Sequence, residues 1–137
     1  MPVTPNSIIT PQTPRAAAVV TTSANTTYTS SPSNTGTLIT AGANGARVTR
    51  IRSTPRASAT ATGLHLFLST DGGTTKLLID SVLMSAHTVA ATTAIPQTDW
   101  GYSEDNPLIL PANAILYVSQ AVTLSDGIVT EAEWADY

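Results

Sequence analysis

Residues 63–84, GLHLFLSTDGGTTKLLIDSVLM, contain two β-prone runs on either side of a turn. In the first run, 63–69, leucine occupies every second position, as expected for a strand with one face in a core. The Asp-Gly-Gly turn at 71–73 supplies the positive-φ positions that a tight hairpin needs. This segment therefore predicts a β-hairpin whose second strand is 75–84.

The rest of the chain repeats this pattern of short β-prone runs separated by turn signals. In the last run, Ile128, Thr130, Ala132 and Trp134 share one face. Eight or nine strands and essentially no helix predict an all-β protein, a single β-sandwich over residues 16–137. Besides the hairpin, the predicted strands are residues 16–22, 37–40, 46–53, 87–95, 107–110, 114–122 and 127–137.

The Asn44-Gly45 pair is a strong signal for a tight hairpin between the runs 37–40 and 46–53. In the second of these runs, ARVTRIRS, strict alternation places Val48 on the face of two arginines and Ile51 on the opposite face. This mixed pattern predicts an exposed or interface strand and not a core strand.

The first 15 residues carry prolines at positions 2, 5, 11 and 14. Proline fixes φ, lacks an N–H and pushes the preceding residue toward extended conformations. Residues 1–15 are therefore predicted to form an extended arm ahead of the sandwich, anchored by Val3, Ile8 and Ile9. Because no basic start precedes an apolar stretch, we expect no signal peptide.

Charge is sparse and segregated. Only 11% of the 137 residues are charged. The first 70 residues carry five arginines and no acid, whereas residues 71–137 carry one lysine and all nine acids. Arginine suits planar pairing with carboxylates at interfaces, so these arginines pair either with acidic strands of the same chain or with another subunit. They are Arg15, Arg47, Arg50, Arg52 and Arg56.

Composition also argues against several classes of partner. The net charge of −3 argues against a nucleic-acid partner, and the apolar runs are too short to cross a membrane. The absence of cysteine excludes disulfides and thiolate metal sites. No serine lies in a Gly-x-Ser-x-Gly context, so we expect neither an enzyme nor a cofactor.

The two histidines, His65 and His87, would need a carboxylate such as Asp80 beside them to form a metal or catalytic site. We favour the simpler interpretation of solvent-facing histidines on strands. Among the C-terminal acids, Glu131, Glu133 and Asp136 would suit a cation, but alternation favours a solvated face for the two glutamates.

Five segments resemble small proteins that are encoded beside capsid genes in tailed bacteriophages. They are TPNSIITPQTPR, TAGANGARVTRI, GLHLFLSTDGGTTKLLIDSVLM, NPLILPANAILYVSQAV and the final WADY. The resemblance covers most of the chain, arm included. It implies a virion-associated β-sandwich, often a jelly roll, that acts as a head decoration or cement protein and has no catalytic residues.

From this resemblance we expect a virion protein, made in the host bacterial cytoplasm, that binds the outer capsid surface and stabilises the shell. Its expected partners are the major capsid protein and copies of itself, as a homotrimer. The alternatives are another tail, collar or fibre component, or a carbohydrate- or receptor-binding module with an aromatic patch from Trp100 and Tyr102. The expected contact residues are Val3, Ile8, Ile9, Arg15, Arg47, Arg50, Arg52 and Trp134.

Overall fold

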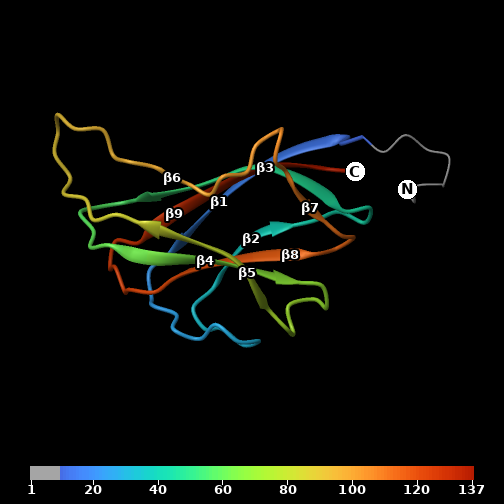
Figure 1. The fold of residues 1–137 in the computed structure, drawn as a ribbon, viewed down its shortest axis with the longest axis horizontal. Helices are drawn as coiled ribbons and strands as arrows, with labels where there is room; N and C mark the ends of the chain where they lie inside the picture. Colours follow the sequence, from blue (N-terminus) through green and yellow to red (C-terminus); the bar gives the residue numbers. More distant parts are fainter. Residues whose placement is uncertain (1–9) are drawn as a thin grey trace.

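Two antiparallel sheets stack face to face in the computed structural model, which describes residues 10–137 (Figure 1). Within that range there is no helix that could span a membrane. The strands are β1 (Thr13–Thr21), β2 (Gly36–Thr40), β3 (Ala46–Pro55), β4 (Thr62–Ser69), β5 (Leu77–Met84), β6 (Thr98–Asp99), β7 (Leu108–Leu110), β8 (Ile115–Gln120) and β9 (Ile128–Asp136).

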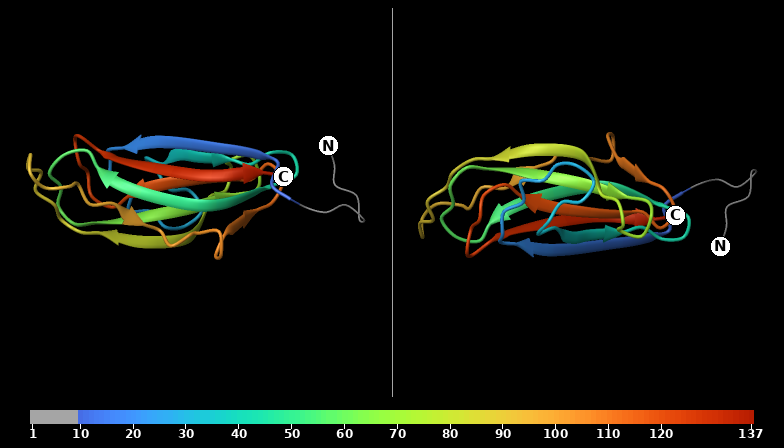
Figure 2. Two further views of the ribbon diagram at one scale, coloured as in Figure 1. Left: turned by 90° about the horizontal axis from the view of Figure 1, so that it is seen from above. Right: turned by 90° about the horizontal axis from the view of Figure 1, so that it is seen from below.

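The strand order identifies the type of sandwich. One sheet has the order β1-β9-β3-β6, with β7 also paired to β3, and the other has the order β2-β8-β4-β5 (Figure 2). The pairs β1–β9, β2–β8, β3–β7 and β4–β5 are nested, as when one long antiparallel ribbon rolls up into two sheets. This is the jelly-roll arrangement. The prediction of an all-β sandwich is confirmed.

The hairpin predicted over residues 63–84 is present as β4 and β5. Its turn depends on Gly72 and Gly73, whose φ angles are 77° and 95°. A Cβ at Gly73 would also lie 2.5 Å from the Tyr117 hydroxyl oxygen, so the turn requires glycine there. The Asp71 carboxylate accepts hydrogen bonds from the Thr75 N–H and the Ser69 hydroxyl, which fixes the turn.

The core lies between the two sheets. The alternation in the C-terminal strand β9 is confirmed, because Ile128, Thr130, Ala132 and Trp134 are all buried. Trp134 is therefore a core residue of its own sandwich. The larger buried apolar side chains of this core are Leu38, Ile39, Val48, Ile51, Leu64, Leu66, Met84, Trp100, Leu110, Leu116, Val118, Ile128 and Trp134.

The prediction that 46–53 forms an exposed or interface strand is wrong. Strand β3 lies between β9 and the short strands β6 and β7, with Val48 and Ile51 fully buried. Its register with β9 shifts between Val48 and Arg50, so Thr49 forms a β-bulge. A bulge adds one residue and reverses the alternation beyond it. Val48 and Ile51 consequently share the core face although they are three residues apart.

Two other expectations are corrected. Residues 87–95 form no strand, and only His87 makes an isolated bridge, to Ala59. Asn44 and Gly45 do form a turn, in which the Gly45 N–H donates to the Gly42 carbonyl at 3.1 Å. The strands on either side of it, β2 and β3, belong to different sheets and do not pair as a hairpin.

Strand β1 begins at Thr13, so the expected boundary at residue 15 between arm and sandwich falls inside this strand. Pro14 is tolerated because β1 is an edge strand, where one side of the backbone needs no ladder partner. The Gln12 N–H donates to the Asp136 carbonyl and ties the chain to β9 before β1 begins. Val3, Ile8 and Ile9 lie outside the described residues.

Candidate interaction surfaces

The outer face of the β1–β9–β3 sheet carries a ladder of ion pairs within the chain. Arg50 Nη2 lies 3.1 Å from Glu131 Oε1 and 3.7 Å from Glu133 Oε1. Arg52 Nη2 lies 3.8 Å from Glu131 Oε1. These side chains are between about a quarter and a half exposed, so each pair contributes little to stability. The two arginines and the two glutamates nevertheless balance each other's charge.

Arg15 and Arg47 also have partners in their own chain. The Arg15 Nε donates to Asp136 Oδ2, and the Gly42 N–H donates to the other oxygen of that carboxylate. Arg47 Nη2 donates to the Glu104 carbonyl at 2.6 Å. Of the two pairings that the sequence left open for the arginines, the one within the chain is present at all four of these positions.

A groove of about 510 Å³ opens beside the start of β1. Its charged lining consists of Arg15 and Arg47 opposed by Glu104 and Glu133. Both arginines are already hydrogen-bonded, and the two signs balance. The groove therefore offers no net charge with which to select an ionic ligand.

The outer face of the other sheet is built differently, because the segment between β1 and β2 passes over β4 and β8 (Figure 2). His65 is only 6% exposed beneath this segment, so the expectation of a solvent-facing histidine is wrong. Its ring lies 4.7 Å from that of Tyr28, and its Nδ1 lies 3.3 Å from the Ser119 hydroxyl. Burial lowers the pKa of His65, so the neutral imidazole is favoured.

Asn25 fixes the covering segment in place and is completely buried. Its backbone N–H donates to the Gln120 carbonyl at 2.7 Å. Its side-chain carbonyl accepts from the N–H groups of Thr27 and Ser33, and its Nδ2 lies 3.3 Å from the Ser119 hydroxyl. These bonds replace the water that the polar loop would otherwise require, so a neutral polar layer is buried here.

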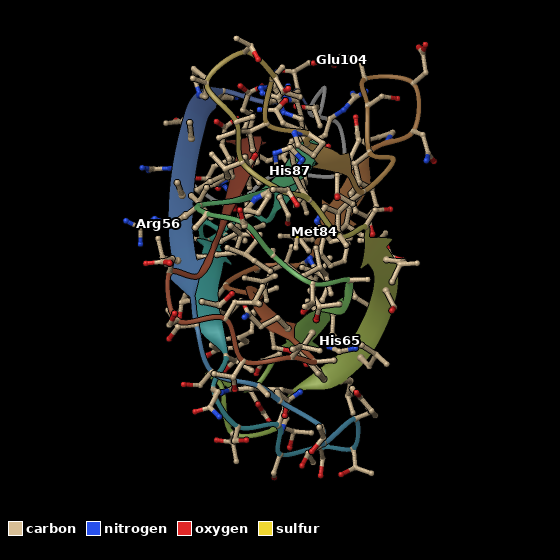
Figure 3. All side chains as sticks on the ribbon, turned by 90° about the vertical axis from the view of Figure 1, so that its left-hand side faces the viewer. Arg56, His65, Met84, His87 and Glu104 are labelled. Carbon is tan, nitrogen blue, oxygen red and sulfur yellow. The ribbon has the colours of Figure 1, made fainter. Side chains whose placement is uncertain are left out.

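The histidines do not converge on a common site. Figure 3 shows His65 and His87 well apart on the sandwich. Asp80 instead accepts a hydrogen bond from the Tyr102 hydroxyl at 2.7 Å, and burial together with this bond raises the pKa of Tyr102. Across residues 10–137, no group of three or more histidine and acidic side chains is placed to hold a metal ion.

The aromatic patch expected from Trp100 and Tyr102 is absent. Trp100 is 5% exposed and its indole N–H donates to the Ser53 hydroxyl at 3.0 Å, which ties the segment after β6 to β3. Tyr102 is partly buried and directed to Asp80. Neither ring presents a free face to a sugar at an open surface, so this basis for a glycan site is lost.

Strand β5 exposes an apolar surface that the sequence analysis did not identify. Along this strand Leu77, Leu78, Ile79 and Leu83 are 57%, 39%, 40% and 68% exposed, and together we call them the β5 surface. They border both sides of the strand, since Leu77 pairs with Leu68 and Leu78 with Phe67 on opposite faces of β4. β5 is the edge of its sheet and contacts only β4 within it. The unbroken run Leu77-Leu78-Ile79 was the available signal, since a strand with one wet face would alternate.

Strand β5 carries one carboxylate, and both of its hydrogen-bond donors belong to the same chain. Asp80 is the only charged residue of β5, and it accepts hydrogen bonds from the Tyr102 hydroxyl and from the Ser81 N–H. The segment from β5 to β6 projects at the left of Figure 1, and its Val89 and Ile95 are also exposed. Clustered exposed apolar side chains of this kind are typical of protein–protein contact sites.

No family model and no curated protein matches the chain. Among solved structures, one match is described as the structure of infectious bursal disease virus Gx strain, with a TM-score of 0.33 and 9% sequence identity. The match covers 99% of this chain but only 36% of that chain.

Proposed function

We propose that this protein is a structural component of a tailed-phage particle, a decoration protein that binds the outer capsid surface and stabilises the shell. The observation that carries the proposal is the β5 surface, an apolar area left uncovered on a jelly roll. The resemblance of five sequence segments to phage head proteins is the reason for proposing a tailed-phage particle.

The mechanism is additive and needs no chemical step. A rigid sandwich bound at many equivalent positions favours the assembled shell over its separated subunits by mass action. Its partners are the major capsid protein and copies of itself, arranged as a homotrimer. In this proposal the protein is not an enzyme, binds no nucleic acid, and resides on the virion after synthesis in the host cytoplasm.

The proposed contacts differ from those expected from sequence. Arg15, Arg47, Arg50 and Arg52 have partners in their own chain, and Trp134 lies in the core. The proposal therefore assigns the contacts with the capsid and between copies, taken together, to the β5 surface and to the N-terminal residues 1–9, which carry Val3, Ile8 and Ile9.

The test is to add purified protein back to particles that lack it. Wild-type protein is expected to bind saturably, whereas a chain without residues 1–9, or one with Leu77→Asp and Leu83→Asp, should lose most of its binding. The deletion stops at residue 9 because Gln12 and Arg15 are bonded to Asp136. Val122→Asp is the matched control, since Val122 is exposed but lies outside the β5 surface. Equal saturation by all four chains would contradict the proposal.

A further inference from the structure

We infer that the β5 surface of one copy is covered by residues 1–9 of a neighbouring copy, so that the subunits associate head to tail. This inference deepens the proposed function, because it specifies how copies of the protein contact one another. It rests on the chemistry of the two partners, on the positions from which they start, and on the form of the β5 edge.

The two partners match in chemistry. The β5 surface is apolar and its single carboxylate, Asp80, is already bonded. Residues 1–9, MPVTPNSII, contain no charged side chain and carry Val3, Ile8 and Ile9. Burying such a segment on such a surface removes apolar area from water, and the segment itself brings no charge to be buried. The β3–β9 face, with its arginines and glutamates, offers no comparable site.

The two partners start from opposite flanks of the sandwich. Strand β1, which continues from the N-terminal residues, is one edge of its sheet, and it packs near β2. Strand β5 is the edge of the other sheet farthest from β2, as both views of Figure 2 show. In a head-to-tail ring, the β1 flank of one copy faces the β5 flank of the next. The N-terminal residues then enter directly at the apolar surface.

The length of residues 1–9 favours the β5 surface of a neighbouring copy over that of the same copy. Nine extended residues span at most about 30 Å, and an eight-residue strand is about 26 Å long. Three strand spacings and one sheet spacing separate the two flanks by roughly 17 Å. More than half of the segment would be used merely to reach its own β5. On a neighbour whose β5 flank lies against β1, more of the segment is left to lie along the strand.

The β5 edge favours side-chain packing over strand addition. Its register with β4 shifts at Ile79, which forms a bulge, and the Ser81 N–H is bonded to the Asp80 carboxylate. Bulges of this kind protect an edge from pairing with another strand. Pro2 and Pro5 in turn remove two donors from the N-terminal segment. Both partners therefore suit an extended segment held by its apolar side chains.

Cysteine cross-linking tests this arrangement cleanly, because the chain contains no cysteine. One full-length chain carries Ile8→Cys and a second, size-tagged chain carries Leu83→Cys. After the two are mixed and oxidised, we expect a disulfide-linked dimer of one tagged and one untagged chain. A chain with both substitutions should give a ladder that ends at the ring size. Val122→Cys replaces Leu83→Cys in the control mixture and should give no such product.

Three results would overturn the inference. Cross-linking of Leu83→Cys to itself would mean that two β5 surfaces face each other. An internally cross-linked monomer from the doubly substituted chain would place the segment on its own sandwich. A wild-type mass equal to one chain by light scattering at tens of micromolar would exclude self-association. Each of these results concerns contacts between copies and not binding to particles, so the capsid-binding part of the proposed function would fail only in the add-back experiment.

A second variant measures the contribution of the surface without a cross-link. Leu83→Asp places a charge on the most exposed leucine of β5. We expect it to weaken self-association by roughly tenfold or more, because a leucine side chain can no longer be buried there. Its unfolding midpoint should match that of the wild type, which separates lost contact from lost folding.

Discussion

The outer faces of the two sheets differ in how their polar side chains are paired. On the β1–β9–β3 sheet, arginines of β3 and glutamates of β9 lie half-exposed and neutralise one another. On the other sheet, the segment between β1 and β2 covers β4 and β8 with a buried, neutral polar layer. That covering does not include β5, which remains apolar and bare.

The difference shows which surfaces have their interaction partners within one subunit and which surface does not. The ion pairs of the charged face form within one subunit and need no partner chain. They contribute little to stability when half-exposed. The covered face acts as a second, smaller core. The β5 surface has neither charge pairing nor a cover, and so it is the part of the molecule that a second protein would complete.

The largest expected effect on stability comes from removing a large side chain from the layer beneath the covering segment. Phe67 is completely buried on the outer side of β4, outside the main core cluster. If this layer is a true second core, Phe67→Ala should lower the free energy of unfolding by about 3–5 kcal/mol. Urea denaturation measures the change. A loss below about 1 kcal/mol, the scale of an exposed ion pair, would erase the distinction between the two faces.

A smaller effect on the free energy of unfolding is expected when the pH is lowered. Because burial lowers the pKa of His65, the unfolded chain binds a proton more readily than the folded chain below pH 6.5, the ordinary histidine value. Stability should therefore fall as the pH drops through and below that value. The neighbouring rings and hydroxyl, from Tyr28, Phe67 and Ser119, offer no negative charge near neutrality to offset the proton.

The measurement is urea denaturation at pH 7 and pH 5 for the wild type and for His65→Gln. The variant should lose part of the pH dependence. An identical pH dependence in the two proteins would show that His65 is not the titrating group.

The smallest effect is expected on the charged face. Arg50→Gln removes a side chain that is 35% exposed and bonded to Glu131, so the loss should be about 1 kcal/mol or less and should shrink in high salt. Self-association should be unchanged, even in a chain with Arg50→Glu and Arg52→Glu that remains folded. Loss of assembly in that folded chain would restore an intersubunit role for the arginines.

The sequence predicted those features of the fold that depend on neighbouring residues. Turn chemistry at Gly72 and Gly73 and the alternation in β4 and β9 gave the hairpin and the sandwich. Long-range features were harder. The bulge at Thr49 depends on which strand pairs with β3, and the pairing of Arg50 with Glu131 joins residues 81 apart in the chain. Strict alternation therefore misread β3.

The remaining errors have related causes. Residues 87–95 are rich in β-branched side chains, but they join the edges of two different sheets and have no strand to pair with. His65 was misplaced because alternation does not reveal that a loop rich in serine, threonine and asparagine can cover a sheet. The β5 surface was missed because its apolar residues read equally well as core.

The most direct test of the proposed structural role is the copy number of this protein in purified particles of the tailed phage that the proposal assumes, measured by quantitative mass spectrometry against the major capsid protein. The proposal predicts a ratio near one or a simple fraction such as about one-third, as closed symmetry on a regular lattice requires. A few copies per particle would point to a tail or collar component, and complete absence would contradict the structural role itself.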